Sequence, residues 1–216
     1  MSKLKGLMIA ALVVLGALWA LRANQRGTLA APAPRPADGV LVGAEPGYGG
    51  LDFQPPWLPV GPYQAMAVGT IDVTARVLAR RDYPATGYGE LLPTDLVLGW
   101  GPMSDNRVID HVTIRQEERG MALQPDATGA ITTEAAYASA LQATVYSDFR
   151  PHSEALAALR VGDVIHLYGW RQKLKDASGA IWAGGTGHEA TGQRAFVVLV
   201  LKLQVGDRKV FGNWGP

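Results

Sequence analysis

Apolar and polar residues alternate along three stretches of the chain, each short enough to form a β-strand. From Val68 to Leu78 the apolar positions fall on one face and the polar positions on the other. The same period of two runs from Val108 to Gln116 and returns from Val164 to Trp170, directly after a Gly-Asp turn. A fourth stretch, Phe196 to Leu203, is apolar apart from Lys202. Alternation predicts half-buried strands, and the continuous run predicts a strand covered on both faces.

Helical signals are fewer. A threonine pair and a following glutamate predict a short helix over residues 132–141, and a Ser-Glu pair opens an Ala/Leu-rich helical turn over 153–159. The pattern therefore predicts a mainly β fold with one or two short helices, arranged as a small barrel. The Gly-Asp strand start at residues 162–169 also occurs in oligonucleotide/oligosaccharide-binding (OB) barrels, which makes an OB-like barrel one form of this prediction.

The N-terminus holds the strongest targeting signal. Gly6 to Leu21 is an uncharged, apolar run of 16 residues between Lys5 and Arg22. It is slightly short of the roughly 20 residues of a membrane span and long for a signal-peptide core, so an anchor and a cleaved signal both remain open. Because the nearby small-x-small cleavage positions are poor, the sequence favours an uncleaved transmembrane helix over a signal.

The charges beside this run predict its orientation. Lys3, Lys5 and the terminal amine precede it, whereas Arg22 and Arg26 follow it. This small bias keeps the N-terminus in the cytoplasm. We therefore expect a single-pass protein of the cytoplasmic (inner) membrane of a bacterial envelope, with its C-terminal domain outside the cytoplasm, in the periplasm.

Proline separates the anchor from the β-rich part. Eight of the 14 prolines fall within residues 32–62, where they disfavour helices and central strands. The sequence predicts an anchor or signal over residues 1–26, a Pro/Gly-rich tether over 27–50, and an extracytoplasmic domain over 51–216. Ordered structure is expected to begin near Leu51.

Composition excludes several classes of site and partner. The chain is 48% apolar and 18% charged and has no cysteine, which rules out disulfides, thiolate zinc sites and cysteine nucleophiles. The first 26 residues hold four of the 20 basic residues and no acidic one, so the remainder carries a net charge of −3. A domain of this charge is a poor binder of phosphate backbones, and no nucleic-acid partner is expected.

Residues 91–105 read Leu-Leu-Pro-Thr-Asp-Leu-Val-Leu-Gly-Trp-Gly-Pro-Met-Ser-Asp. This segment resembles a signature of an uncharacterised group of single-pass, membrane-anchored bacterial proteins. In that group a strand like residues 71–78 precedes the signature and a Gly-Asp strand like 162–169 follows it. A His-containing segment also precedes the second strand, and residues 147–152 occupy that place with altered spacing. The resemblance covers residues 68–170 and implies no known activity or cofactor.

The signature also has a direct physical interpretation. Its Pro-Thr-Asp95 start is typical of a turn or cap, and residues 96–98 form a short apolar strand. Trp100 follows in a Gly-Trp-Gly-Pro bend, where it has no bulky neighbour. Such a bend either presents the indole in a groove or folds it into the core.

Four polar residues in or near the signature are candidates for acid/base chemistry: Asp95, Asp105, Asp110 and His152. Asp95 has a structural alternative as a cap and Asp105 as a turn residue, and the catalytic residues stay unknown. The predicted binding residues are Asp95, Trp100, Asp105 and His152. The histidines, at positions 111, 152, 166 and 188, lack the spacing of a helical zinc motif, so no metal or other cofactor is predicted.

Two functions of different classes follow. The first is a non-enzymatic binding or scaffold module, attached to the membrane through Gly6 to Leu21, with a protein or envelope-polymer partner. The second is an envelope-acting hydrolase that uses Asp95 or Asp105 together with His152. Single-strand nucleic-acid binding on a barrel face is a third idea, which only the Gly-Asp strand suggests.

Overall fold

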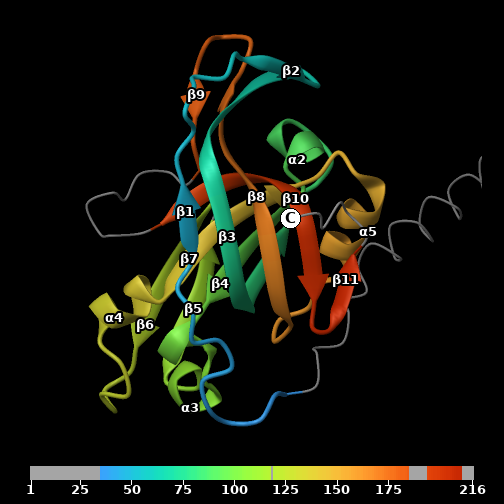
Figure 1. Ribbon diagram of the computed structural model, residues 1–216. Helices are drawn as coiled ribbons and strands as arrows, with labels where there is room; N and C mark the ends of the chain where they lie inside the picture. The colour runs from blue at the N-terminus through green and yellow to red at the C-terminus, as the bar shows by residue number, and fades with distance from the viewer. Residues whose placement is uncertain (1–34, 118, 185–193, 211–216) are drawn as a thin grey trace, which may run out of the picture. The chain divides into compact units, whose positions relative to one another are not determined.

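The computed structural model describes residues 35–117, 119–184 and 194–210 (Figure 1). This part of the chain is mainly β, as the alternation predicts. Among its helices none is both long and apolar enough to cross a membrane. The predicted anchor over Gly6 to Leu21 lies outside the described residues.

Five strands pair into a closed ring. The ring consists of β3 (Tyr63–Asp82), β4 (Thr94–Gly99), β7 (Ala140–Tyr146), β10 (Ala195–Val205) and β8 (Val164–Lys175), paired in that order. A further pairing between β3 and β8 closes it. All neighbours are antiparallel except β7 and β10, which are parallel.

The longest strand, β3, makes this closure possible. Residues 64–76 of β3 pair with β8 and residues 76–82 pair with β4, so one strand belongs to both sides of the ring. The register shifts at Val68 on the β8 side and at Leu78 on the β4 side. Such bulges bend a strand and increase its twist, which lets β3 curve around the core.

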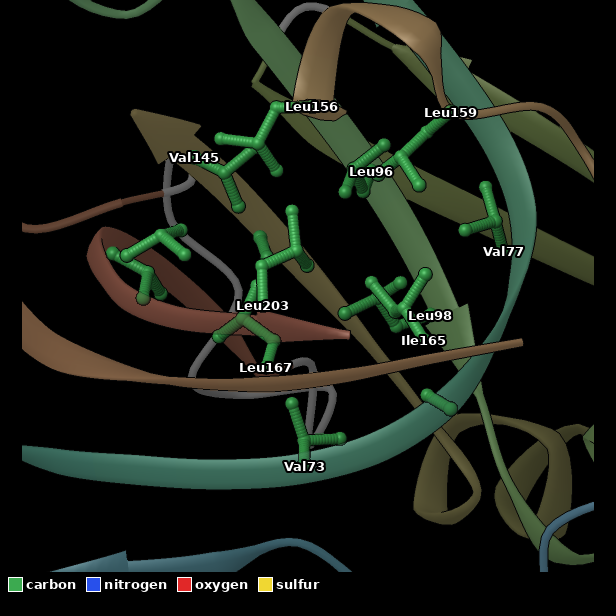
Figure 2. Packing of buried hydrophobic residues seen from close by; sticks show 14 of the residues in the cluster. Val73, Val77, Leu96, Leu98, Val145, Leu156, Leu159, Ile165, Leu167 and Leu203 are labelled. Atoms are coloured by element: carbon green, nitrogen blue, oxygen red, sulfur yellow. The ribbon is translucent and has the colours of Figure 1, made fainter. Parts of the chain in front are cut away.

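The main core fills the ring. Alternate residues of β3 (Ile71, Val73, Ala75 and Val77) point inward and are at most 1% exposed, which confirms the predicted alternation. Helix α5 (Arg150–Ala158) places Leu156 in the same cluster. Figure 2 shows Leu156 and Leu159 packing toward side chains of the strands, including Leu96, Leu98, Ile165 and Leu167. The interior is therefore a packed core.

A second layer covers the outer face of β4. It is built by a hairpin of β5 (Val112–Glu117) and β6 (Gly120–Pro125) and by helix α4 (Thr133–Ala138). The second apolar cluster consists of Leu78, Val97, Met103, Val112, Met121, Leu123, Ile131, Ala136 and Ala140. As a result, every residue of β4 and β7 is buried.

Short elements complete the described structure. Strands β1 (Gly47–Gly49) and β2 (Leu58–Val60) pair with β3, β9 (Ile181–Trp182) pairs with β8, and β11 (Arg208–Val210) pairs with β10. The short helices are α2 (Tyr88–Leu91), the 3-10 turn η1 (Gly101–Ser104) and α3 (Asn106–Ile109).

One predicted strand is partly wrong. The strand expected from Val108 begins only at Val112, because residues 106–109 form α3. The Asp105 carboxylate caps this helix by accepting a hydrogen bond from Arg107 N at 2.9 Å. The helix predicted over 132–141 is capped by Thr132 but ends at Ala138, since β7 begins at Ala140.

Candidate functional site

Asp95 lies at the start of β4 and faces outward, beneath the tip of the β5–β6 hairpin. It is fully buried. Its Oδ1 accepts hydrogen bonds from Arg119 Nη1 at 3.0 Å and Thr144 Oγ1 at 2.6 Å, and its Oδ2 accepts one from Tyr83 OH at 2.7 Å. Because both oxygens have protein partners inside the fold, Asp95 is not exposed to a substrate.

Arg119 reaches Asp95 from the hairpin turn, where its φ of 55° is unusual for a residue other than glycine. Its guanidinium lies 3.8 Å from the centre of the Tyr83 ring, and its Nη2 donates to Leu92 O at 3.1 Å. Burial, followed by the hydrogen bond to Asp95, raises the pKa of Tyr83. We call Asp95, Arg119, Tyr83 and Thr144 the hairpin lock, because they fasten the hairpin to β4.

Trp100 follows β4 and is 1% exposed. Its backbone N–H donates to Ser139 O at 3.0 Å, and its indole belongs to the main core cluster. The next residue, Gly101, has a φ of 52°, which a side chain at this position would strain. Of the two interpretations of the bend, the structure therefore favours a folding role for Trp100.

Ser104 and Asp105, at the end of the signature, hold the chain that precedes β1. Ser104 Oγ accepts hydrogen bonds from Leu41 N and Val42 N, each at 3.1 Å, and Asp105 Oδ1 accepts one from Gly39 N at 3.0 Å. Hydrogen bonding from Arg107 holds the pKa of Asp105 well below its usual range. These contacts make Asp105 a structural anion.

Arg76 and Asn106 extend the same contact. Buried Arg76 donates from Nη1 to Asn106 Oδ1 at 2.8 Å, and Asn106 Nδ2 donates to Pro36 O at 2.7 Å. Burial lowers the pKa of Arg76. Arg35 also pairs with Asp110, with Nη2 and Oδ2 2.5 Å apart, which accounts for this further acid/base candidate. We call the contact of residues 35–42 with residues 104–110 the N-terminal latch.

The latch differs from the spacer that the sequence predicts through residue 50. Val42 is 5% exposed and belongs to the main core, and β1 begins at Gly47. Proline disfavours helices and strands, but it leaves carbonyl groups and neighbouring N–H groups free to bind polar side chains. Ordered structure therefore begins before Leu51. The rest of the predicted tether, residues 27–34, lies outside the described residues.

His152 lies in α5 and is 1% exposed. Its Nδ1 is 3.4 Å from Ser147 Oγ, and its ring meets Phe149 edge-on at 4.9 Å between centroids. Burial lowers the pKa of His152, although contacts with the backbone of Val200 and Val210 oppose this shift. The imidazole is thus held neutral inside the fold.

The structure does not bring the four predicted site residues together. Asp95 and Trp100 lie five positions apart along one extended segment, about 16 Å at the usual rise of a strand. His152 belongs to α5, which packs into the ring, whereas Asp95 faces outward. An acid and a base that act on one bond must reach the same substrate atom. This geometry therefore gives no support to the hydrolase alternative.

A group of aromatic side chains that the sequence did not single out lies where two loops meet. Tyr88 of α2 stacks on Tyr63 with ring centres 4.8 Å apart, and its ring centre is 6.0 Å from that of Trp182 in β9. Tyr88 OH also donates to Asp176 Oδ2 at 3.2 Å. We call Tyr63, Tyr88 and Trp182 the loop aromatic cluster. Figure 1 shows that β2, α2 and β9 lie at the same end of the ring.

Exposed apolar residues surround this cluster. Tyr88 is 37% exposed, Leu58 in β2 is 55% exposed and Ile181 beside Trp182 is 59% exposed. Nearby, Lys175 Nζ lies 4.7 Å from the centre of the Trp57 ring. The only signal for this surface in the sequence is the occurrence of tyrosine and tryptophan in loops, which alone does not show that they meet.

Comparisons with known proteins add no relative. No protein-family model, no curated protein and no solved structure matches the chain. Across the described ranges, no group of three or more acidic or histidine side chains is placed to hold a metal ion.

Proposed function

We propose that this chain is a binding module, held at the bacterial inner membrane by its N-terminal segment, whose OB-like barrel engages a protein partner outside the cytoplasm. The loop aromatic cluster is the observation that carries the proposal. The anchor and its orientation rest on the apolar run Gly6 to Leu21 and on the charges beside it.

Strand order supports an OB-like barrel. Numbered 1 to 5 along the chain, the ring strands are β3, β4, β7, β8 and β10. They pair in the order 1-2-3-5-4, and strand 4 pairs with strand 1 to close the ring. The third and fifth strands, β7 and β10, are parallel, and helix α5 lies between the third and fourth strands. A five-stranded Greek-key barrel of this kind is the OB plan.

The face of the ring formed by β4 and β7 is covered, which leaves the loops as the place for a ligand. OB barrels bind ligands on the face of their second and third strands and with the loops that follow the first and fourth strands. Here the second and third strands are β4 and β7, which are buried throughout. The two loops correspond to residues 83–93 and 176–194, and they carry Tyr88 and Trp182 of the cluster.

The exposed residues at the cluster favour a protein over an envelope polymer. Leu58, Tyr88 and Ile181 present apolar and aromatic surface, with the charged residues Asp176 and Lys175 beside it. The centres of protein interfaces are enriched in aromatic side chains and depleted in charge. A binding role also agrees with the scattered positions of Asp95, Asp105 and His152.

Site-specific photocrosslinking in intact cells tests the proposal. A photoreactive amino acid at Ile181 of the full chain is expected to give a discrete crosslinked band. Val161, an aliphatic residue of similar exposure (47% against 59%) in the turn before β8, is the matched control and is expected to give none. Equal labelling at both positions, or no adduct at Ile181, would exclude the cluster as the partner surface.

Membrane attachment is tested separately. The full chain is expected to stay with the membrane in alkaline carbonate. External protease is expected to cut its domain in spheroplasts but not in inverted vesicles. Release by carbonate, or the opposite protease pattern, would contradict the anchor without bearing on the cluster.

A further inference from the structure

Two arginines approach the ring of one tyrosine, Tyr48. The Arg171 guanidinium of β8 lies 5.4 Å from the centre of the Tyr48 ring, and the Arg194 guanidinium, just before β10, lies 5.9 Å from the same ring. Tyr48 belongs to β1 and is 41% exposed, so solvent reaches this place. We call Arg171, Arg194 and Tyr48 the arginine pair site.

Further aromatic rings hold the two guanidinium groups. Arg171 also lies 5.3 Å from the centre of the Phe196 ring, and Arg194 lies 5.8 Å from that of Trp100. Both distances are within the range of cation–π attraction. The buried signature residue Trp100 thus contacts one of the two arginines. The ring contacts position each guanidinium without an ion pair to a described carboxylate.

The backbone beside Arg171 leaves room for its side chain. A Cβ added at Gly69 of β3 would overlap Arg171 Nη2 and would lie 2.6 Å from Gly49 O. Arg171 Nη2 is itself 3.4 Å from Gly49 O, the outer limit of a hydrogen bond. Arg171 Nε is buried and has no hydrogen-bond partner within the described ranges. Because Nε is shielded from solvent, the donors open to a ligand are those of the two Nη groups, of which only Nη2 contacts a described residue.

Neither arginine has a carboxylate partner among residues 35–117, 119–184 and 194–210. Five other arginines do, namely Arg35, Arg80, Arg107, Arg119 and Arg150. Of the other described arginines without such a partner, Arg81, Arg115, Arg160 and Arg208 are exposed. Arg76 is buried, but its Nη1 donates to Ser104 O and Asn106 Oδ1. Arg171 and Arg194 are instead half-buried. Burying a cation without an anion is costly, and two neighbouring cations add repulsion.

Tyr48 does not supply the missing negative charge. Burial raises the pKa of its hydroxyl, and this effect outweighs the opposing influence of Arg194 and Arg171. Tyr48 therefore stays a neutral phenol at physiological pH. Glu45 lies close enough to influence Tyr48, but no ion pair joins it to either arginine.

We propose that Arg171 and Arg194 form a binding site for a phosphate group, with Tyr48 at its side. Guanidinium groups bind phosphate oxygens through paired N–H donors. One group here comes from β8 and the other from the residue just before β10, so they can take different oxygens. A phosphate carries up to two negative charges at physiological pH, which matches two half-buried cations beside one tyrosine ring. The site lies apart from the loop aromatic cluster and does not depend on the partner proposed there.

The test measures phosphate binding by the full chain in a non-ionic detergent. Calorimetric titration with inorganic phosphate, at constant ionic strength set with chloride, is expected to show one saturable site. Arg171→Gln and Arg194→Gln are each expected to weaken binding at least tenfold. Arg115→Gln, which removes an exposed arginine of β5, is the matched control and is expected to leave the affinity unchanged.

A second ligand distinguishes the source of the phosphate. Dihexanoyl-phosphatidylglycerol, used below its micellar concentration, presents the phosphodiester of a lipid headgroup. Competition with inorganic phosphate assigns the site to lipid headgroups as well, whereas failure to compete restricts it to free phosphate or phosphate monoesters. Either result supports the site if the Arg171→Gln substitution abolishes the binding.

The proposal is overturned if the wild-type chain binds neither ligand at millimolar concentration, or if both glutamine variants bind like the wild type. Arg171→Lys and Arg194→Lys guard against loss of folding, because they keep the positive charge. They are expected to melt near the wild-type temperature yet bind phosphate more weakly, since lysine lacks the paired donors. Equal affinity in folded lysine variants would contradict recognition by the guanidinium groups.

Discussion

The hairpin lock and the arginine pair site both place an arginine beside a tyrosine ring, but only the arginine of the hairpin lock forms an ion pair with a described carboxylate. Arg119 lies over Tyr83 and pairs with fully buried Asp95. Arg171 lies beside Tyr48 and has no carboxylate partner within the described structure. The difference suggests how to separate the two roles: an arginine whose donors are used internally fastens the fold, and an arginine whose donors are unused is available to a ligand.

The largest expected effect is at the lock. Asp95→Ala leaves the Arg119 cation buried without its anion, and breaking a buried ion pair in this way costs about 3–5 kcal/mol. We expect the free energy of unfolding, measured by urea denaturation of the full chain in detergent, to fall by about that amount. The double variant Asp95→Leu with Arg119→Met removes both charges and is expected to recover much of the loss. A double variant no more stable than Asp95→Ala would contradict the pairing argument.

The next effect is at the N-terminal latch. Ser104→Ala removes the acceptor of Leu41 N and Val42 N, and an unsatisfied buried group costs about 1–3 kcal/mol. We expect a loss of stability in this range and faster proteolysis within residues 35–42. Ser178→Ala, in an exposed turn, is the control and is expected to change stability by less than about 0.5 kcal/mol.

Protonation of His152 makes the free energy of unfolding depend on pH. Burial lowers its pKa in the folded chain, so between pH 7 and 5 the unfolded state takes up a proton that the folded state resists. The stabilisation is present above the unfolded pKa of about 6.5 and is lost as the pH falls below it. We expect the free energy of unfolding to decrease over this range in the wild type and to decrease less in His152→Gln. An identical slope in both chains would contradict this assignment.

The smallest stability effect is expected at the arginine pair site. Arg171→Gln and Arg194→Gln break no ion pair, and the weak ring contacts they lose are offset by the relief of repulsion between two cations. The unfolding free energy is therefore expected to change by less than about 1 kcal/mol while phosphate binding is lost. A loss as large as that of Asp95→Ala would show that these arginines fasten the fold instead.

The ring strands were largely predictable from the sequence, because their core faces repeat with a fixed period. Alternation over residues 68–78 and 164–170 identified the central parts of β3 and β8, and the apolar run from Phe196 identified β10. β7 was missed because both of its faces are buried and it directly follows α4, so residues 132–141 resembled one helix. β5 was predicted with its start four residues too early, because Asp105 caps a helix over residues 106–109, and β6 was not predicted.

The contacts of the polar residues could not be predicted in the same way. Asp95 and Asp105 are ten positions apart in one signature, but Asp95 meets a hairpin residue and Asp105 meets the chain before β1. The partners of Arg171 and Arg194 likewise come from distant strands. Such contacts depend on strand register and on the path of loops, and neither is encoded by a local pattern.

The position of β10 has a consequence for how the molecule forms. β10 lies between β7 and β8 in the ring, and it is the last of the five ring strands along the chain. Its parallel pairing with β7 joins residues more than 50 positions apart in the sequence. Bringing such distant residues together has a high loop-closure entropy cost, which makes this contact slow to form. The ring therefore cannot close until all five of its strands have been synthesised. Before that moment β7 and β8 have unpaired edges, the state in which aggregation and chaperone binding are most favoured.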